Sequence, residues 1–135
     1  MSDDGPITTL HLTGMSAVAD VRHRVAAICR DHGVNPDELP LVAYELAVNA
    51  IRHGRKPAQV TVLTRGNKLV VRVTDARPCA LPGPAATDTE SETGRGLAIA
   101  RELSEFSWRI SGNHKHAEAA VPLPPGIRQP APLAL

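Results

Sequence analysis

The stretch that decides the fold is Glu45-Leu46-Ala47-Val48-Asn49-Ala50-Ile51-Arg52-His53-Gly54. Apolar residues recur here at helical spacing, which predicts an amphipathic helix that Gly54 ends. Glu45 and Asn49 are four residues apart, so both emerge on one face, at the margin of the apolar stripe where cleft-lining side chains belong. A carboxylate can act as a general base, and a carboxamide oxygen can bind a hard cation. The alternative interpretation is a solvated Glu/Asn stripe on an exposed helix.

Length and composition exclude several classes of protein. A chain of 135 residues is the size of one domain. With one Phe, one Trp and one Tyr, its core must be built from aliphatic residues. Fifteen Lys and Arg against 14 Asp and Glu leave a formal charge of +1, which gives no support for direct nucleic-acid binding or for attraction to anionic membranes. Residues 1–4 lack the basic and apolar regions that are typical of a signal peptide, and no apolar run approaches the ~20 residues that span a bilayer. We expect a cytoplasmic protein.

The patterning predicts an α+β fold. Expected strands cover 7–12, which is typical of an edge strand, and 59–64, 68–74, 107–110 and 117–123. Expected helices cover 16–32, the segment from about 35–40 to 53, and the segment from 94. Ser16 and Asn35 are the expected N-caps of the first two helices, and Gly33 the stop of the first. The resulting architecture is a two-layer α/β sandwich with a mixed, mostly antiparallel sheet and three helices on one face.

Two segments do not fit a regular element. Residues 76–93 contain three prolines and the acidic residues Asp88, Glu90 and Glu92, which is typical of a long functional lid. Residues 124–135 are Pro-rich and aperiodic, which predicts a disordered tail. We therefore assign the domain to 1–123 and the tail to 124–135.

Three polar groups are expected at element ends around one cavity. Asp75, at the exit of a strand, can accept a hydrogen bond from an exocyclic amine such as that of adenine. Asn49 can hold Mg²⁺ through its carbonyl oxygen, with triphosphate oxygens and water as the other ligands. Gly94 and Gly96 allow the backbone at a helix N-terminus to approach phosphates. Arg95 adds a positive charge where charge develops on the γ-phosphate.

These motifs resemble those of the histidine-kinase-like ATPase superfamily over residues 7–123. The N box is matched by Glu45-x-x-x-Asn49-Ala50-x-x-His53-Gly54, a degenerate first glycine box by Asp75-x-x-Pro78, and the second glycine box by Gly94-x-Gly96-Leu97. The small size resembles that of the anti-sigma-factor serine/threonine kinases, which have the Bergerat ATP-binding fold. The resemblance implies ATP and Mg as cofactors. It also implies a sigma factor, an anti-sigma-factor antagonist with a phosphoacceptor serine, and a second copy of the chain as partners.

The same resemblance implies roles for individual residues. Glu45 would be the catalytic base, Asn49 the Mg²⁺ ligand and Asp75 the group that recognises adenine. The remaining nucleotide-binding candidates are His53, Arg77, Gly94, Arg95, Gly96 and Leu97.

The sequence departs from the family pattern in two places. Ala76, Arg77 and Pro78 replace the glycines of the first box, and His114-Lys115-His116 replaces the late Gly-Thr pair. Two function classes therefore remain open. One is a Mg-ATP-dependent serine/threonine kinase with anti-sigma activity. The other is a nucleotide-binding module that traps a protein partner without phosphoryl transfer.

Structural interpretations compete at some of these residues. His53 can instead cap its helix through the imidazole. Arg77 can contact phosphate or lie solvated in the loop. His114 and His116 are expected on a turn, where two histidines without a third ligand are usually solvated. Trp108 is expected in the core or at an interface. Cys29 and Cys79 lack metal-ligand spacing and are expected as free thiols.

Overall fold

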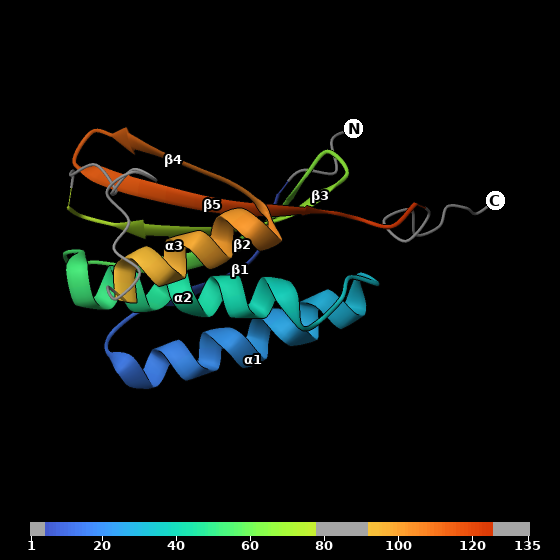
Figure 1. Ribbon diagram of the computed structural model, residues 1–135, viewed down its shortest axis with the longest axis horizontal. Coiled ribbons are helices and arrows are strands. Elements are labelled where there is room, and N and C mark those ends of the chain that lie inside the picture. Colours follow the sequence, from blue (N-terminus) through green and yellow to red (C-terminus); the bar gives the residue numbers. More distant parts are fainter. Residues whose placement is uncertain (1–4, 78–91, 126–135) are drawn as a thin grey trace.

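A five-stranded sheet carries the fold, and three helices pack on one of its faces (Figure 1). The computed structural model describes residues 5–77 and 92–125, with the backbone alone at 92–95. The elements in chain order are β1 (Gly5–His11), α1 (Met15–Asp31), α2 (Glu38–His53), β2 (Gln59–Arg65), β3 (Lys68–Asp75), α3 (Glu92–Leu103), β4 (Glu105–Ser111) and β5 (His114–Pro122). The expected α+β sandwich is confirmed.

The sheet has the strand order β1-β2-β3-β5-β4, so β1 is an edge strand as expected. All four pairings between the described strands are antiparallel, and the expectation of a mixed sheet is wrong in this detail. The reason is the path of the chain after β3. It crosses over through α3, places β4 at the far edge, and returns β5 by a hairpin into the space between β4 and β3.

Helix α1 ends as the sequence predicts and begins differently. Gly33 has φ 69°, a conformation that favours glycine. The Val34 N–H donates to the Cys29 carbonyl at 2.8 Å and the Gly33 N–H to the Arg30 carbonyl at 3.3 Å, which is a Schellman C-terminus. At the other end the N-cap is Gly14, and no side chain caps the helix. The assignment of Ser16 as N-cap is therefore wrong, because Ser16 lies inside the first turn.

Helix α2 begins at Glu38 with Asp37 as its N-cap, again without a side-chain cap. The Asn35 carboxamide oxygen instead accepts the N–H of Asp37 at 2.7 Å, so Asn35 forms a local turn before the helix. Pro40 is the third helical residue. The first four N–H groups of a helix have no intrahelical partner, so a proline there removes no hydrogen bond.

The core between the helices and the inner face of the sheet is aliphatic. Its largest fully buried side chains are leucines and valines, including Leu39, Leu69, Leu97, Val21 and Val71. Phe106 and Trp108 are partly buried against this core, as expected for Trp108. Cys29 is buried within it as a free thiol, and desolvation raises its pKa to about 11. Cys79 and most of the expected lid lie outside the described residues, which include only the two ends of the lid.

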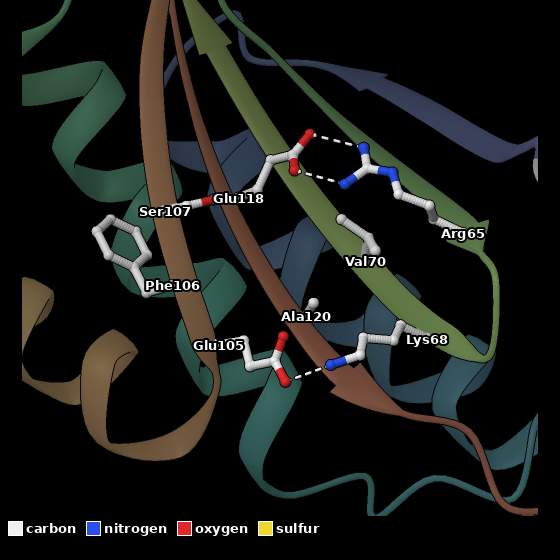
Figure 2. Close-up of a pocket in the computed structure, with 8 residues that line it drawn as sticks. All are labelled: Arg65, Lys68, Val70, Glu105, Phe106, Ser107, Glu118 and Ala120. Atoms are coloured by element: carbon white, nitrogen blue, oxygen red, sulfur yellow. Dashed lines mark hydrogen bonds and ion pairs between the residues drawn. The ribbon is translucent and has the colours of Figure 1, made fainter.

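Ion pairs connect the strands on the outer face of the sheet. Glu118 accepts two hydrogen bonds from Arg65, at 2.9 and 3.0 Å, and one from Arg72 Nε at 2.8 Å. These bonds, the one from Arg65 above all, lower the pKa of Glu118 to about 2. Figure 2 shows the Arg65–Glu118 pair facing a second pair, Lys68 and Glu105, across Val70 and Ala120. The hollow between them has a volume of about 360 Å³.

Candidate functional site

A second, much smaller cavity of about 20 Å³ lies between α2, α3 and the inner face of β3 and β5. It contains most of the residues that the sequence singled out. Its walls are aliphatic, with three polar side chains among them; the lining residues are Leu46, Asn49, Ala50, Val73, Asp75, Leu97, Lys115 and Ala117. An apolar chamber with a few convergent polar groups is the usual form of a small-molecule site.

The first glycine of interest, Gly96, brings α3 against the N-box face of α2. A Cβ on Gly96 would lie 3.1 Å from Glu45 Oε1 and 3.7 Å from Asn49 Nδ2. A larger residue here would therefore have to displace the Glu45 carboxylate or move α3 away from α2. Leu97, the next residue, is buried in the cavity wall. The structure thus places Glu45, Asn49, Gly96 and Leu97 together.

Helix α3 begins at Glu92, two residues before the expected Gly94. Its first turn therefore contains the backbone of Gly94 and Arg95. Since the first four N–H groups of a helix lack intrahelical partners, the amides available to a phosphate belong to residues 92–95. The side chain of Arg95 lies outside the described part of the structure.

Asn49 carries an unsatisfied polar group into the cavity. Its Nδ2 is buried and has no hydrogen-bond partner among the described residues. Leaving such a group unpaired costs about 1–3 kcal/mol, which a ligand would recover. Rotation of the carboxamide by 180° about the Cβ–Cγ bond would present its oxygen at the same position.

This donor set fits a Mg²⁺ ion held mainly by its nucleotide. Among residues 5–77 and 92–125, no group of three or more His, Cys, Asp or Glu could hold a metal ion. A hard cation beside Asn49 would thus take one carboxamide oxygen from the protein and its other ligands from phosphate and water, as is usual for Mg²⁺ in nucleotide sites.

Asp75 lies at the end of β3 and is 3% exposed. Its Oδ1 accepts the backbone N–H of Arg77 at 2.8 Å. The C-terminal residue of the N box packs directly on it, because a Cβ on Gly54 would be 2.7 Å from the Asp75 Cγ. The first glycine box and the end of the N box are therefore in contact through one carboxylate.

Lys115 also lines the cavity, although its position in the sequence did not predict this. His114 and His116 were expected on a turn, but both belong to β5, and the turn is centred earlier, at Gly112 with φ 61°. Lys115 pairs with Asp75 in the register of β3 and β5 and is 8% exposed. Its Nζ is 3.7 Å from Asp75 Oδ2. The signal was available: residues 115, 117, 119 and 121 alternate onto one face, and the last three are Ala, Ala and Val.

His53 and Arg77 lie at the exposed rim and not among the cavity lining. The Arg77 guanidinium donates a hydrogen bond to the backbone carbonyl of His53, the last residue of α2. A cation at a helix C-terminus is favourable for the unpaired carbonyls and for the helix dipole. The structure thus gives Arg77 the capping role that the sequence analysis considered for the imidazole of His53.

The hollow on the outer face is larger, yet its charged side chains already bond to one another (Figure 2). The small inner cavity differs in two ways. The Asn49 Nδ2 atom there has no hydrogen-bond partner among the described residues, and the Lys115–Asp75 ion pair is too long for a hydrogen bond. The inner cavity is therefore the candidate functional site.

Comparison with known proteins shows the family of the chain. The family model for the histidine kinase-like ATPase domain matches residues 14–115, which is most of the chain. The chain therefore belongs to the histidine kinase-like ATPase domain family, and its membership supports ATP binding. No curated protein matches it significantly. In the described ranges, no helix has both the length and the hydropathy to cross a membrane.

Proposed function

We propose that this chain is an ATP-binding anti-sigma factor that phosphorylates a serine of an anti-sigma-factor antagonist protein, with Mg²⁺ as the metal ion. The observation that carries the proposal is the packing of Glu45 and Asn49 against Gly96, where the carboxamide of Asn49 has no described partner. A base, a metal ligand and a phosphate-approaching helix start meet at this point.

The length of α2 separates two ends of the site. Glu45 and Gly54 are nine residues apart, which is roughly 13 Å along a helix. Asp75 lies at the Gly54 end, and Gly96 lies at the Glu45 end. The aliphatic walls and Asp75 would receive the adenine ring, while the start of α3 and Asn49 would face the phosphates. His53 and Arg77 would border the nucleotide at the exposed rim.

Binding requires the site to open. The cavity of about 20 Å³ holds little more than one water molecule, whereas sites for drug-sized ligands are about 300–1,000 Å³. Since Gly96 and Leu97 form one wall, α3 must move away from α2 when a nucleotide enters. The α2–α3 contact is therefore the part of the protein that would respond to nucleotide.

Glu45 is placed to act as the base in phosphoryl transfer. It is half-buried on the cleft side of α2, and no hydrogen bond or ion pair to another described residue occupies its carboxylate. The Glu45 carboxylate would accept the proton of the serine hydroxyl. At the same time the serine oxygen would bond to the γ-phosphorus, and the bond between the γ-phosphorus and the oxygen of the leaving ADP would break. Mg-ATP supplies the phosphoryl group, and the amides of residues 92–95 would offset charge on its oxygens.

A second candidate is a partner-trapping module that binds nucleotide weakly and transfers no phosphate. It is favoured by the Lys115–Asp75 ion pair inside the adenine end of the site and by the missing first-box glycines. A sigma factor or its antagonist would then be regulated by binding alone.

Incubation of the purified protein with Mg²⁺ and labelled ATP, alone and then with a candidate antagonist, separates the two candidates. The kinase proposal expects label on the antagonist's serine with the parent protein and none with Glu45→Gln. Glu102→Gln, an exposed position on α3, is the matched control and should transfer normally. Capture of the antagonist without any transfer by the parent protein would establish the trapping module instead.

A further inference from the structure

Lys115 is a buried ammonium group that the proposed function leaves without a role. It lies at the start of β5, lines the inner cavity and is 8% exposed. Lysine is almost never fully buried unless it is paired. The one side-chain interaction that Lys115 makes with a described residue is the ion pair with Asp75.

That ion pair leaves hydrogen-bonding capacity on both partners. The separation of 3.7 Å between Nζ and Oδ2 is too long for a hydrogen bond, although the charges attract. Asp75 Oδ1 is already used by the N–H of Arg77, which leaves Oδ2 as the acceptor that faces Lys115. The ammonium has three donors. A buried donor and a buried acceptor side by side, neither saturated by the other, are suited to a ligand that offers the complementary pair.

We propose that Lys115 and Asp75 together read the edge of the adenine ring, with Lys115 as a specificity-determining residue. Asp75 Oδ2 accepts a hydrogen bond from the exocyclic 6-amine, and Lys115 Nζ donates one to the neighbouring ring nitrogen N1. This inference rests on the proposed function, because it needs a nucleotide in the cavity. Guanine presents the reverse order, an acceptor at position 6 and a donor at N1, and would place like groups against both side chains.

The surroundings strengthen this reading of the base. Val73, Leu97 and Ala117 supply apolar walls near the two charged groups, and a low local dielectric makes each hydrogen bond there stronger than in water. The carboxylate of Asp75 offsets part of the cost of burying the ammonium. The alternation of β5 fixes the side on which Lys115 points, so the donor is held by the sheet and not by a loop.

The test uses 1-deaza-ATP, in which a C–H replaces N1 and removes the acceptor. Calorimetry on the parent protein should show ATP bound about 10- to 100-fold more tightly than 1-deaza-ATP, the ratio that corresponds to one hydrogen bond from a charged donor. In Lys115→Met, which keeps the length of the side chain, the two nucleotides should bind equally. Lys56→Met, at an exposed lysine outside the cavity, should keep the parent ratio.

Equal affinity of the parent protein for ATP and 1-deaza-ATP would overturn the inference and leave the proposed function standing. So would tighter ATP binding by Lys115→Met, since Lys115 would then only obstruct the cavity. Should Lys115→Met fail to fold, the comparison of the two nucleotides on the parent protein decides alone. A parent protein that binds no nucleotide at all would refute the proposed function and, with it, this inference.

Discussion

Gly54 rests directly on the carboxylate of Asp75: a Cβ built on the glycine would lie 2.7 Å from the Asp75 Cγ and 2.8 Å from its Oδ2. The same Cβ would be 2.6 Å from the backbone carbonyl oxygen of Ala50, which cannot move without distorting α2. The backbone of Gly54 has φ −89°, which any residue can adopt, so the glycine is required by space and not by conformation. The N box and the first glycine box are joined at this contact.

The first prediction concerns this contact. Gly54→Ala should lower the free energy of unfolding by about 1–3 kcal/mol, the usual cost of overpacking, and should displace Asp75 from the site. Denaturant unfolding measures the loss, and calorimetry with ATP measures the displacement. Gly5→Ala is the control, because a Cβ there meets nothing within 4 Å. If the two variants have the same free energy of unfolding, the backbone around Gly54 accommodates the added Cβ without loss of stability.

The second prediction concerns Asp75 itself. Asp75→Asn should weaken the binding of ATP by about 1–3 kcal/mol. An amide lacks the negative charge of the carboxylate and can present its NH₂ group, a donor, to the adenine amine. It also leaves Lys115 buried without its counter-charge, so the free energy of unfolding should fall as well. The double variant Asp75→Asn, Lys115→Met should recover part of that stability but not the ATP affinity. A parent protein that binds ATP and GTP equally would contradict the role of Asp75.

The third prediction separates chemistry from binding in the N box. Glu45→Gln keeps the size of the side chain but cannot accept a proton, so nucleotide should bind while transfer falls by roughly 10²–10⁴-fold. Asn49→Ala removes the carboxamide, so the affinity for Mg-ATP should fall more than the affinity for metal-free ATP. Phosphotransfer and nucleotide binding are measured on both variants together. Identical losses of binding in the two would mean that the pair is structural.

The fourth prediction concerns acid stability. In the folded protein the pKa of Glu118 is lowered from 4.5 to about 2, mainly by Arg65. The ionised carboxylate therefore contributes its stability above about pH 4.5, and this contribution is lost as the pH falls toward 2. After allowance for solvent screening we expect about 1–2 kcal/mol.

Glu118→Gln should accordingly reduce the free energy of unfolding more at pH 7 than at pH 2.5, as followed by denaturant unfolding at each pH. Arg65→Met should diminish the same pH dependence, because it removes the largest cause of the shift. If Glu118→Gln lowers the free energy of unfolding equally at both pH values, the ion pairs on the outer face do not cause the pH dependence of stability.

The sequence was sufficient for the features that repeat along the chain or require a special backbone. The helical stripe through Leu46 and Ala50, the two stops at Gly33 and Gly54, and the edge position of β1 all agree with the structure. Periodicity carries this information because it reflects which face is buried. The predicted N-cap residues were wrong for a local reason. The Asn35 side chain accepts a hydrogen bond within the turn before α2, and α1 starts directly after Gly14.

The candidate site was predictable where motifs lie on one element and not where strands meet. Glu45 with Asn49 follows from helical geometry, and the structure adds that Gly96 touches both. The Asp75–Lys115 pair depends on the register between β3 and β5. Sequence spacing does not contain that register, and the two flanking histidines of Lys115 disguised the alternation of the strand.

The chain contains an intrinsic fluorescence probe near the cavity. Trp108 is the single tryptophan of the chain, and in the β4–β5 register it lies opposite Ala117, which lines the inner cavity. Side chains of directly opposed residues emerge on the same face of a sheet, so the indole lies beside the cavity wall from which α3 would move if the proposed opening occurs. Its emission depends on the polarity around it and comes from one place only. Entry of a ligand into the cavity can thus be followed by intrinsic fluorescence, without an attached dye and without knowing the partner.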